Sequence, residues 1–226
     1  AAQAGGKVIA STSGHAILLS GKPFFPIISW AQCPADIERN LAIGVNVFMG
    51  VACGASDLVA ALTGRAYVVP EYSSLGEEPP LLIGHHLVDE PDGNGVPPEA
   101  LPSTERVGKT GRLVFLTVTA KFVGAPPSVL KKYEAYAKRA DVIGFDIYPL
   151  AKHCEHKWVD IQLVYEGQRT LLRLASGKPT FQWIEVNGLE ESCGENPMTP
   201  ETVRAEAWLA IAGGATGLGY FVHGWP

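Results

Sequence analysis

Residues 81–91 (LLIGHHLVDEP) and residues 178–185 (KPTFQWIE) share one pattern, an apolar run of strand length that closes on a glutamate. The two glutamates are Glu90 and Glu185. In a barrel of parallel strands, the carboxyl ends of all strands lie at one face, so side chains distant in sequence meet there. If both runs are strands of one barrel, Glu90 and Glu185 lie at the same end of it.

The rest of the chain alternates between strand-like and helix-like segments, which is the order expected for a parallel sheet with helical crossovers. The predicted barrel strands are residues 24–30, 45–49, 65–70, 82–88, 113–119, 142–148, 180–184 and 216–222. The predicted helices are residues 34–43, 56–63, 128–140, 158–176 and 199–214, with a short one within 98–107. The sequence therefore predicts an α/β fold, a (β/α)8 TIM barrel with thin or missing outer helices.

One domain is expected over residues 1–226, with residues 1–23 forming an N-terminal β-hairpin that leads into the barrel. Two helix starts carry side chains that can accept from free backbone N–H groups: Ser128, and Thr199 followed by Pro200. No closing helix is predicted before Pro226, which fits a trimmed barrel or a fragment of a longer protein.

The charge balance argues against a nucleic-acid partner. The 226 residues carry 18 Lys and Arg against 23 Asp and Glu, a formal net charge of −5, and show no basic stripe. No apolar run approaches the roughly 18 residues of a membrane helix, so no membrane partner is expected either. Residues 108–110 (GKT) resemble part of a phosphate-binding loop, but the required earlier glycine is Ser103.

Three motifs at predicted strand ends resemble one family of barrel enzymes. They are residues 88–91 (VDEP) after the fourth strand, residues 146–149 (DIYP) after the sixth, and Glu185 after the seventh. This layout resembles the retaining glycoside hydrolases of clan A, and residues 89–92 (DEPD) are similar to a poorly characterised branch of them. The likeness runs from Phe24 onward. Clan A commonly has Asn before its acid/base, where it contacts the sugar 2-hydroxyl, whereas this chain has Asp89.

The resemblance implies a role for each glutamate. Glu90 would be the general acid/base and Glu185 the nucleophile, the pair of carboxyl groups that glycosidic cleavage needs. Glu90 must hold a proton, which burial or repulsion from Asp89 favours. Glu185 must stay ionised, which needs donors such as the hydroxyl of Tyr148. The alternative for either glutamate is an ordinary charge on a surface loop.

Further residues at strand ends are candidates for binding the substrate. They are Asp89, Tyr148, Asp146, Trp30, Trp183, Trp225 and His86. Asp146 and Tyr148 share one strand parity, His86 shares the parity of Glu90, and tryptophan rings can stack on sugars. Clan A barrels often carry a tryptophan after the eighth strand, where Trp225 stands. Capping, rim packing and core packing remain the alternatives.

The four cysteines all follow predicted strands and so fall on one face of the barrel. Pairing of Cys33 with Cys53, and of Cys154 with Cys193, is the arrangement that joins neighbouring strands. Two such bridges would imply an oxidising compartment and a secreted protein. Free thiols in a cytosolic protein are the alternative, and zinc ligation is the weaker one because no short Cys-x-x-Cys spacing is present.

The combined prediction is a glycosidase that cleaves β-glycosidic bonds in oligo- or polysaccharides with retention, without a metal or other cofactor. One alternative is a metal-dependent barrel hydrolase that uses His85, His86, Asp89, Glu90, His153, Glu155 and His156, although their spacing matches no rigid metal motif. Another is a non-catalytic carbohydrate-binding barrel. The sugar, the linkage and the oligomeric state are not predicted.

Overall fold

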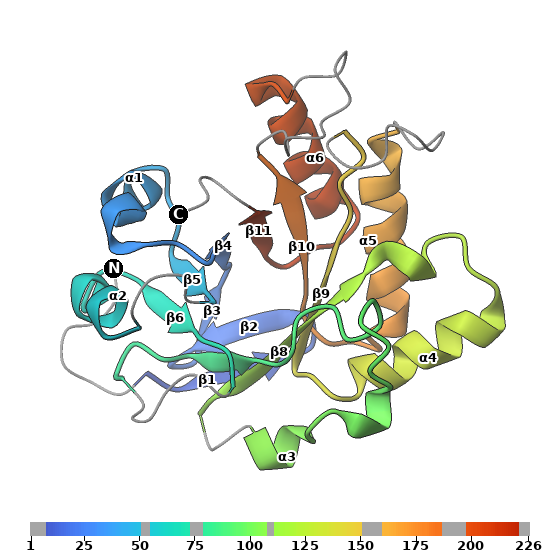
Figure 1. Cartoon of the computed structure of the whole chain (residues 1–226), viewed down its shortest axis with the longest axis horizontal. Coiled ribbons are helices and arrows are strands. Elements are labelled where there is room, and N and C mark those ends of the chain that lie inside the picture. Colours follow the sequence, from blue (N-terminus) through green and yellow to red (C-terminus); the bar gives the residue numbers. More distant parts are fainter. Residues whose placement is uncertain are drawn as a thin grey trace.

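Eight parallel strands form a nearly closed barrel in the computed structural model of the chain (Figure 1). The structure describes residues 8–50, 55–72, 79–107, 111–150, 160–186 and 198–221. The barrel strands are β4 (Ile27–Trp30), β5 (Val47–Met49), β6 (Tyr67–Val69), β7 (Gly84–His86), β8 (Leu113–Thr119), β9 (Val142–Asp146), β10 (Thr180–Glu185) and β11 (Leu218–Phe221). The predicted (β/α)8 fold is confirmed.

The barrel closes through two different kinds of pairing. β11 pairs in parallel with β10 on one side and with β4 on the other, so the last strand joins the first. The remaining seam, between β6 and β7, is held by two isolated parallel bridges, Val68 to Leu82 and Glu71 to His86. At this seam the His86 backbone N–H donates to the Pro70 carbonyl at 2.8 Å.

The outer layer of helices is uneven, as the sequence predicts. The α-helices are α1 (Ile37–Ala42), α2 (Ala55–Leu62), α3 (Thr104–Val107), α4 (Pro127–Ala137), α5 (Gln162–Leu174) and α6 (Pro200–Ala212), with short 3-10 turns η1 (Pro34–Asp36), η2 (Pro98–Ala100) and η3 (Ala120–Phe122). The long helices α4, α5 and α6 lie on the side of β8, β9 and β10 (Figure 1). In the described part of the chain no helix lies between β6 and β7, and no helix is long and apolar enough to cross a membrane.

The N-terminal hairpin covers the end of the barrel where the strands begin. It is a three-stranded antiparallel sheet of β1 (Ala10–Ser13), β2 (Ala16–Leu19) and β3 (Lys22–Phe24). Ile17 and Leu19 pack into the barrel interior, and the buried Arg112 donates from Nη1 to the Val8 carbonyl at 2.6 Å. With this end filled, space for a ligand lies at the opposite end, where the strands finish.

Side chains on the barrel strands alternate between two apolar environments. On β10, Phe181 and Trp183 point into the barrel, whereas Ile184 packs outward against the helices. Both faces of the strand are therefore buried, and even its polar residues Thr180, Gln182 and Glu185 are shielded from solvent.

Several predicted boundaries differ from the structure, and two of the differences have a clear local reason. Residues 22–24 belong to the hairpin sheet, and the first barrel strand begins at Ile27, after Pro26, whose nitrogen cannot donate to a ladder. The N-cap of α4 is Pro126 and not Ser128, because Pro127 occupies the first turn, where a missing N–H costs little. The cap at Thr199 is confirmed, since its hydroxyl accepts from the Thr202 N–H in a capping box.

Candidate functional site

A cavity of about 120 Å³ opens at the carboxyl end of the barrel. Its walls come from five strands and from the loops after β7 and β9, and they bring together Trp30, Asp89, Glu90, Thr117, Asp146, Tyr148, Trp183 and Phe221. Six of the residues predicted from the sequence to act at one site therefore share one cavity.

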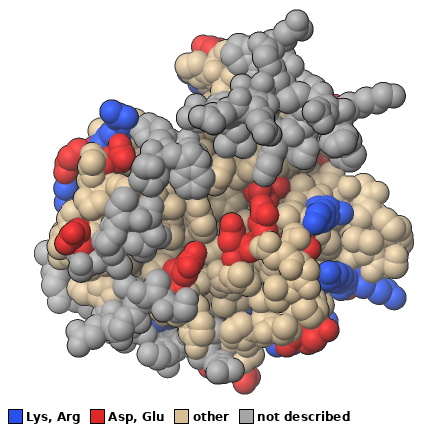
Figure 2. Space-filling model, in the orientation of Figure 1, with Lys and Arg blue, Asp and Glu red and all other residues tan. Residues whose placement is uncertain are grey.

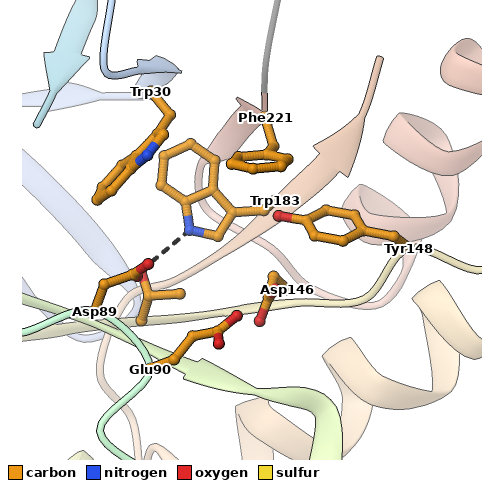
Figure 3. A pocket seen from close by; sticks show the side chains of 8 residues that line it. Trp30, Asp89, Glu90, Asp146, Tyr148, Trp183 and Phe221 are labelled. Carbon is orange, nitrogen blue, oxygen red and sulfur yellow. Dashed lines mark hydrogen bonds between the residues drawn. The ribbon is translucent and has the colours of Figure 1, made fainter. Parts of the chain in front are cut away.

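Aromatic rings occupy one side of the cavity (Figure 3). The rings of Trp30 and Trp183 meet edge to face at 5.5 Å between centroids, and Tyr148 stacks on Phe221 at 5.2 Å. Trp183 lies over Gly219 of the neighbouring strand, where any Cβ would clash with the indole ring. The glycine is thus required for the tryptophan to reach its position at the cavity wall.

Carboxyl groups occupy the other side, where the side chains of Asp89, Glu90 and Asp146 lie together (Figure 3). In the space-filling view, Asp and Glu atoms gather near the centre of the face and the visible Lys and Arg atoms lie farther out (Figure 2). Burial raises the pKa of Asp89 to about 6, helped by the charges of Glu90 and Glu71. The like-charge effect that appears in the structure therefore acts on Asp89, whereas the sequence prediction concerned Glu90.

Glu90 has an unusual backbone conformation, with φ of +43°. A residue with a Cβ enters this left-handed region only when the surroundings hold it there, and such residues cluster at functional sites. Here the Glu90 carbonyl accepts from the Asn94 N–H at 3.0 Å, and the Asn94 amide donates to the Asp89 carbonyl at 3.1 Å. The turn aims the Glu90 side chain at the cavity.

Asp92 fastens this turn to the rest of the barrel. The buried Asp92 carboxylate accepts from the Thr119 N–H at 2.9 Å, from the Thr119 hydroxyl, and from the Tyr133 hydroxyl at 2.6 Å. The second aspartate of the DEPD motif is thus an anchor between the loop, β8 and α4, and it does not line the cavity.

Replacement of this anchor should destabilise the protein. We expect Asp92→Ala to lower the free energy of unfolding by about 2–4 kcal/mol, because buried donors on Thr119 and Tyr133 lose a charged acceptor. Urea unfolding followed by circular dichroism measures the change, with Glu134→Ala, an exposed residue of α4, as the control. Equal midpoints for the two variants would contradict the anchoring role.

A buried polar group supports the cavity from below. The Thr117 hydroxyl accepts from the Trp183 indole N–H at 3.1 Å and lies 3.0 Å from Nε2 of His86. Burial lowers the pKa of His86 to about 3, so its ring is neutral. His86 points into the barrel, as its predicted parity requires, but it lies beneath the cavity and meets Trp30 edge to face at 5.3 Å.

Glu185 is buried at the end of β10, with 2% of its surface exposed, and it is not among the residues that line the cavity. Its Oε1 accepts from the Leu150 backbone N–H at 2.7 Å, so the loop after β9 supplies a donor to the predicted nucleophile. Burial raises the pKa of Tyr148 strongly, and the charges of Asp146, Asp89, Glu90 and Glu185 add to the effect. Both glutamates therefore act on the same tyrosine.

Several predicted residues lie outside the described residues: Trp225, Cys53, Cys154, Cys193, His153, Glu155 and His156. Cys33 is disulfide-bonded. Its partner falls outside the described residues, so both predicted pairings stay predictions. The described residues contain no group of three or more His, Cys, Asp or Glu side chains placed to hold a metal ion.

Sequence reasoning missed Thr117, Phe221 and Glu206. Thr117 is a polar residue at an inward position of β8, and Phe221 stands near the end of β11, so strand parity could have found both. Glu206 is fully buried on α6, where Val203 and Ala210 share its face. The sequence signal that could have identified Glu206 is a glutamate that stands among apolar residues on one face of a predicted helix.

A second depression, of about 560 Å³, adjoins the cavity. Its lining includes Asp89, which the two spaces share, and the exposed ring of Tyr72 on the side of β6 and β7. Its other walls are Glu71, which follows β6, and mostly apolar residues of the loop after β7. The cavity and the wider groove thus meet at Asp89, the residue that precedes Glu90 in the chain.

Known structures share the barrel with this chain. The carboxyl transferase domain of Rhizobium etli pyruvate carboxylase is similar over 88% of this chain and 40% of its own length, with 10% identity and a TM-score of 0.52. A β-glucuronidase of Bacteroides uniformis is similar over 92% of this chain and 31% of its own length, with 10% identity and a TM-score of 0.57. No family model and no curated protein matches the sequence. These likenesses establish the TIM-barrel fold that barrel enzymes of unrelated chemistry share.

Proposed function

We propose that this protein is a glycoside hydrolase that cleaves β-glycosidic bonds with retention of configuration. The observation that carries the proposal is the cavity at the barrel mouth, where Glu90 and two further carboxyl groups face a wall of aromatic rings. Aromatic faces stack on the C–H surfaces of sugars, and carboxylates accept hydrogen bonds from their hydroxyls. The similarity in fold to a β-glucuronidase agrees with this proposal.

The proposed reaction has two steps. In the first, the Glu90 carboxylic acid gives its proton to the glycosidic oxygen while the Glu185 carboxylate attacks the anomeric carbon, which leaves a covalent glycosyl ester. In the second, the Glu90 carboxylate removes a proton from water, and the resulting hydroxide displaces Glu185 from the sugar. The enzyme returns to its starting state, and the anomeric configuration is retained.

The remaining cavity residues would bind and orient the sugar. Asp89 and Asp146 offer acceptors for hydroxyl groups, and Trp30 and Trp183 offer ring faces beside them. Because a general acid stands on the side of the leaving group, the groove next to Asp89 would receive the departing part of the substrate. A groove of about 560 Å³ is in the range of small-molecule sites, which favours oligo- or polysaccharides as substrates. If the predicted disulfides form, the protein acts outside the cytoplasm.

Assays on a panel of substrates test this proposal. The protein is incubated with p-nitrophenyl β-glycosides and β-linked polysaccharides, and proton NMR records the anomer that forms first. Hydrolysis that first releases the β-anomer and survives chelation with EDTA would support the proposal. Release of the α-anomer, loss of activity with EDTA, or glycan binding without hydrolysis across the panel would overturn it.

A further inference from the structure

Glu206 carries a buried carboxyl group that the proposed mechanism does not use. It lies on α6 with none of its surface exposed, and neither carboxyl oxygen has a hydrogen-bond partner of ordinary geometry in the described part of the chain. No Lys, Arg or His of the described residues forms an ion pair with it. An isolated charge in such a place is very costly, so the group must be neutral or share a proton.

The charged neighbour of Glu206 is Glu185. Helix α6 packs against β10, at whose end Glu185 stands, and against α5. Burial raises the pKa of Glu206 far above its ordinary value of 4.5, and the adjacent charge of Glu185 raises it further.

The other groups around Glu206 do not compensate its charge. On β10, which packs against α6, Gln182 is a buried neutral amide, and on β11 burial raises the pKa of Tyr220. The ionisable side chains of α5, which are Tyr165, Glu166, Arg169 and Arg173, are exposed, as are Glu201 and Arg204 of α6 itself. Among the described residues, Glu185 is therefore the charged group that acts on Glu206.

Two neighbouring buried carboxyl groups cannot both be ionised, so the pair holds one proton. The hydrogen bond from the Leu150 N–H to Glu185 favours the charged form of Glu185, and Glu206 has no such donor. The proton therefore belongs on Glu206 and the charge on Glu185.

We propose that Glu206 is a positioning residue, whose protonated carboxyl group donates to Glu185 and, together with the Leu150 N–H, holds that side chain ionised at the end of β10. The role of Glu206 in catalysis rests on the proposed function, whereas the sharing of one proton between Glu206 and Glu185 does not. A protonated carboxyl group on a helix outside the barrel would thus stabilise the ionised nucleophile, which a basic side chain beside the nucleophile could also do.

The shared proton can be tested without any substrate. A carboxyl group whose pKa is raised by folding binds its proton more tightly in the folded state, so stability is lost as the pH rises above 4.5. In this range Glu206 should increase the equilibrium constant for unfolding of the wild type by up to about tenfold for each pH unit. Urea unfolding from pH 4 to 9 should show this contribution in wild type and in Glu201→Gln, a matched change at an exposed position, but not in Glu206→Gln. Equal pH dependence in all three proteins would overturn the pairing.

Activity tests the positioning role. Glu206→Gln keeps an N–H donor, so it should retain kcat within about threefold and leave the acidic limb of the pH profile in place. Glu206→Leu removes the donor, so the acidic limb of kcat/KM should move upward by about one pH unit, because Glu185 then accepts its proton more readily. A general packing defect would lower the rate without moving this limb, and that result would overturn the role. If no glycoside is hydrolysed, the proposed function fails while the unfolding data still decide the pairing.

Discussion

Glu90→Gln should reduce kcat on β-glycosides with poor leaving groups by about 10²–10⁴-fold. The amide has nearly the shape of the acid, but it cannot give a proton to the glycosidic oxygen or remove one from water. Substrates whose leaving group is a weakly basic phenol, such as 2,4-dinitrophenol, need little protonation. For these the first step should be nearly unaffected, and the covalent intermediate should accumulate because the second step lacks its base.

Azide provides the decisive measurement on the same variant. It attacks without base assistance, so it should restore turnover of the dinitrophenyl substrate by Glu90→Gln and yield a β-glycosyl azide. Glu99→Gln, an exposed glutamate in the loop that follows β7, is the matched control and should behave as wild type. A Glu90→Gln variant with wild-type rates on alkyl glycosides, or one that azide does not restore, would remove Glu90 from the mechanism.

The sequence predicts the barrel well because its strands carry an unambiguous signal. The strand predicted at residues 113–119 is β8 as observed, and the strand predicted at 180–184 differs from β10 by one residue. Both strands are buried on two faces, so β-branched and aromatic residues make up most of β8 and bulky apolar residues make up half of β10. Predicting which end of the barrel carries the site required only the direction of parallel strands, and Asp89, Glu90, Asp146 and Tyr148 do meet there.

What the sequence could not predict is the direction of individual side chains at and just after the ends of the strands. The left-handed backbone at Glu90 depends on contacts with Asn94 and on close packing at Gly93, which no local pattern announces. The orientation of Glu185 likewise involves the Leu150 N–H, a donor from the loop after β9 that lies 35 positions away in the sequence. Strand periodicity places a residue on a face, but the partners that orient it come from the tertiary fold.

Glu185→Gln should lower the hydrolysis of every β-glycoside by about 10⁴–10⁶-fold, as losses of a nucleophile generally do. The amide oxygen can still accept from the Leu150 N–H, so the fold should be kept and the loss should reflect chemistry alone. Thermal unfolding near that of wild type verifies this, and Glu166→Gln, at an exposed position of α5, is the control. With the smaller Glu185→Ala, azide should enter the vacated space and give an α-glycosyl azide, the opposite configuration to the product of Glu90→Gln.

A comparison with Asp146 makes the result for Glu185→Gln informative whether the variant loses its activity or keeps it. Asp146 lines the cavity beside Glu90, whereas Glu185 is buried beyond its lining, so two carboxylates compete for the role of nucleophile. If Glu185 attacks, Asp146→Asn should weaken binding of the substrate and raise KM while azide leaves its rate unchanged. A Glu185→Gln variant that keeps its rate, together with an Asp146→Asn variant that loses it and is restored by azide, would transfer the nucleophile to β9. That outcome would place both reacting carboxyl groups on the acidic side of the cavity, opposite the aromatic wall on which the sugar would stack.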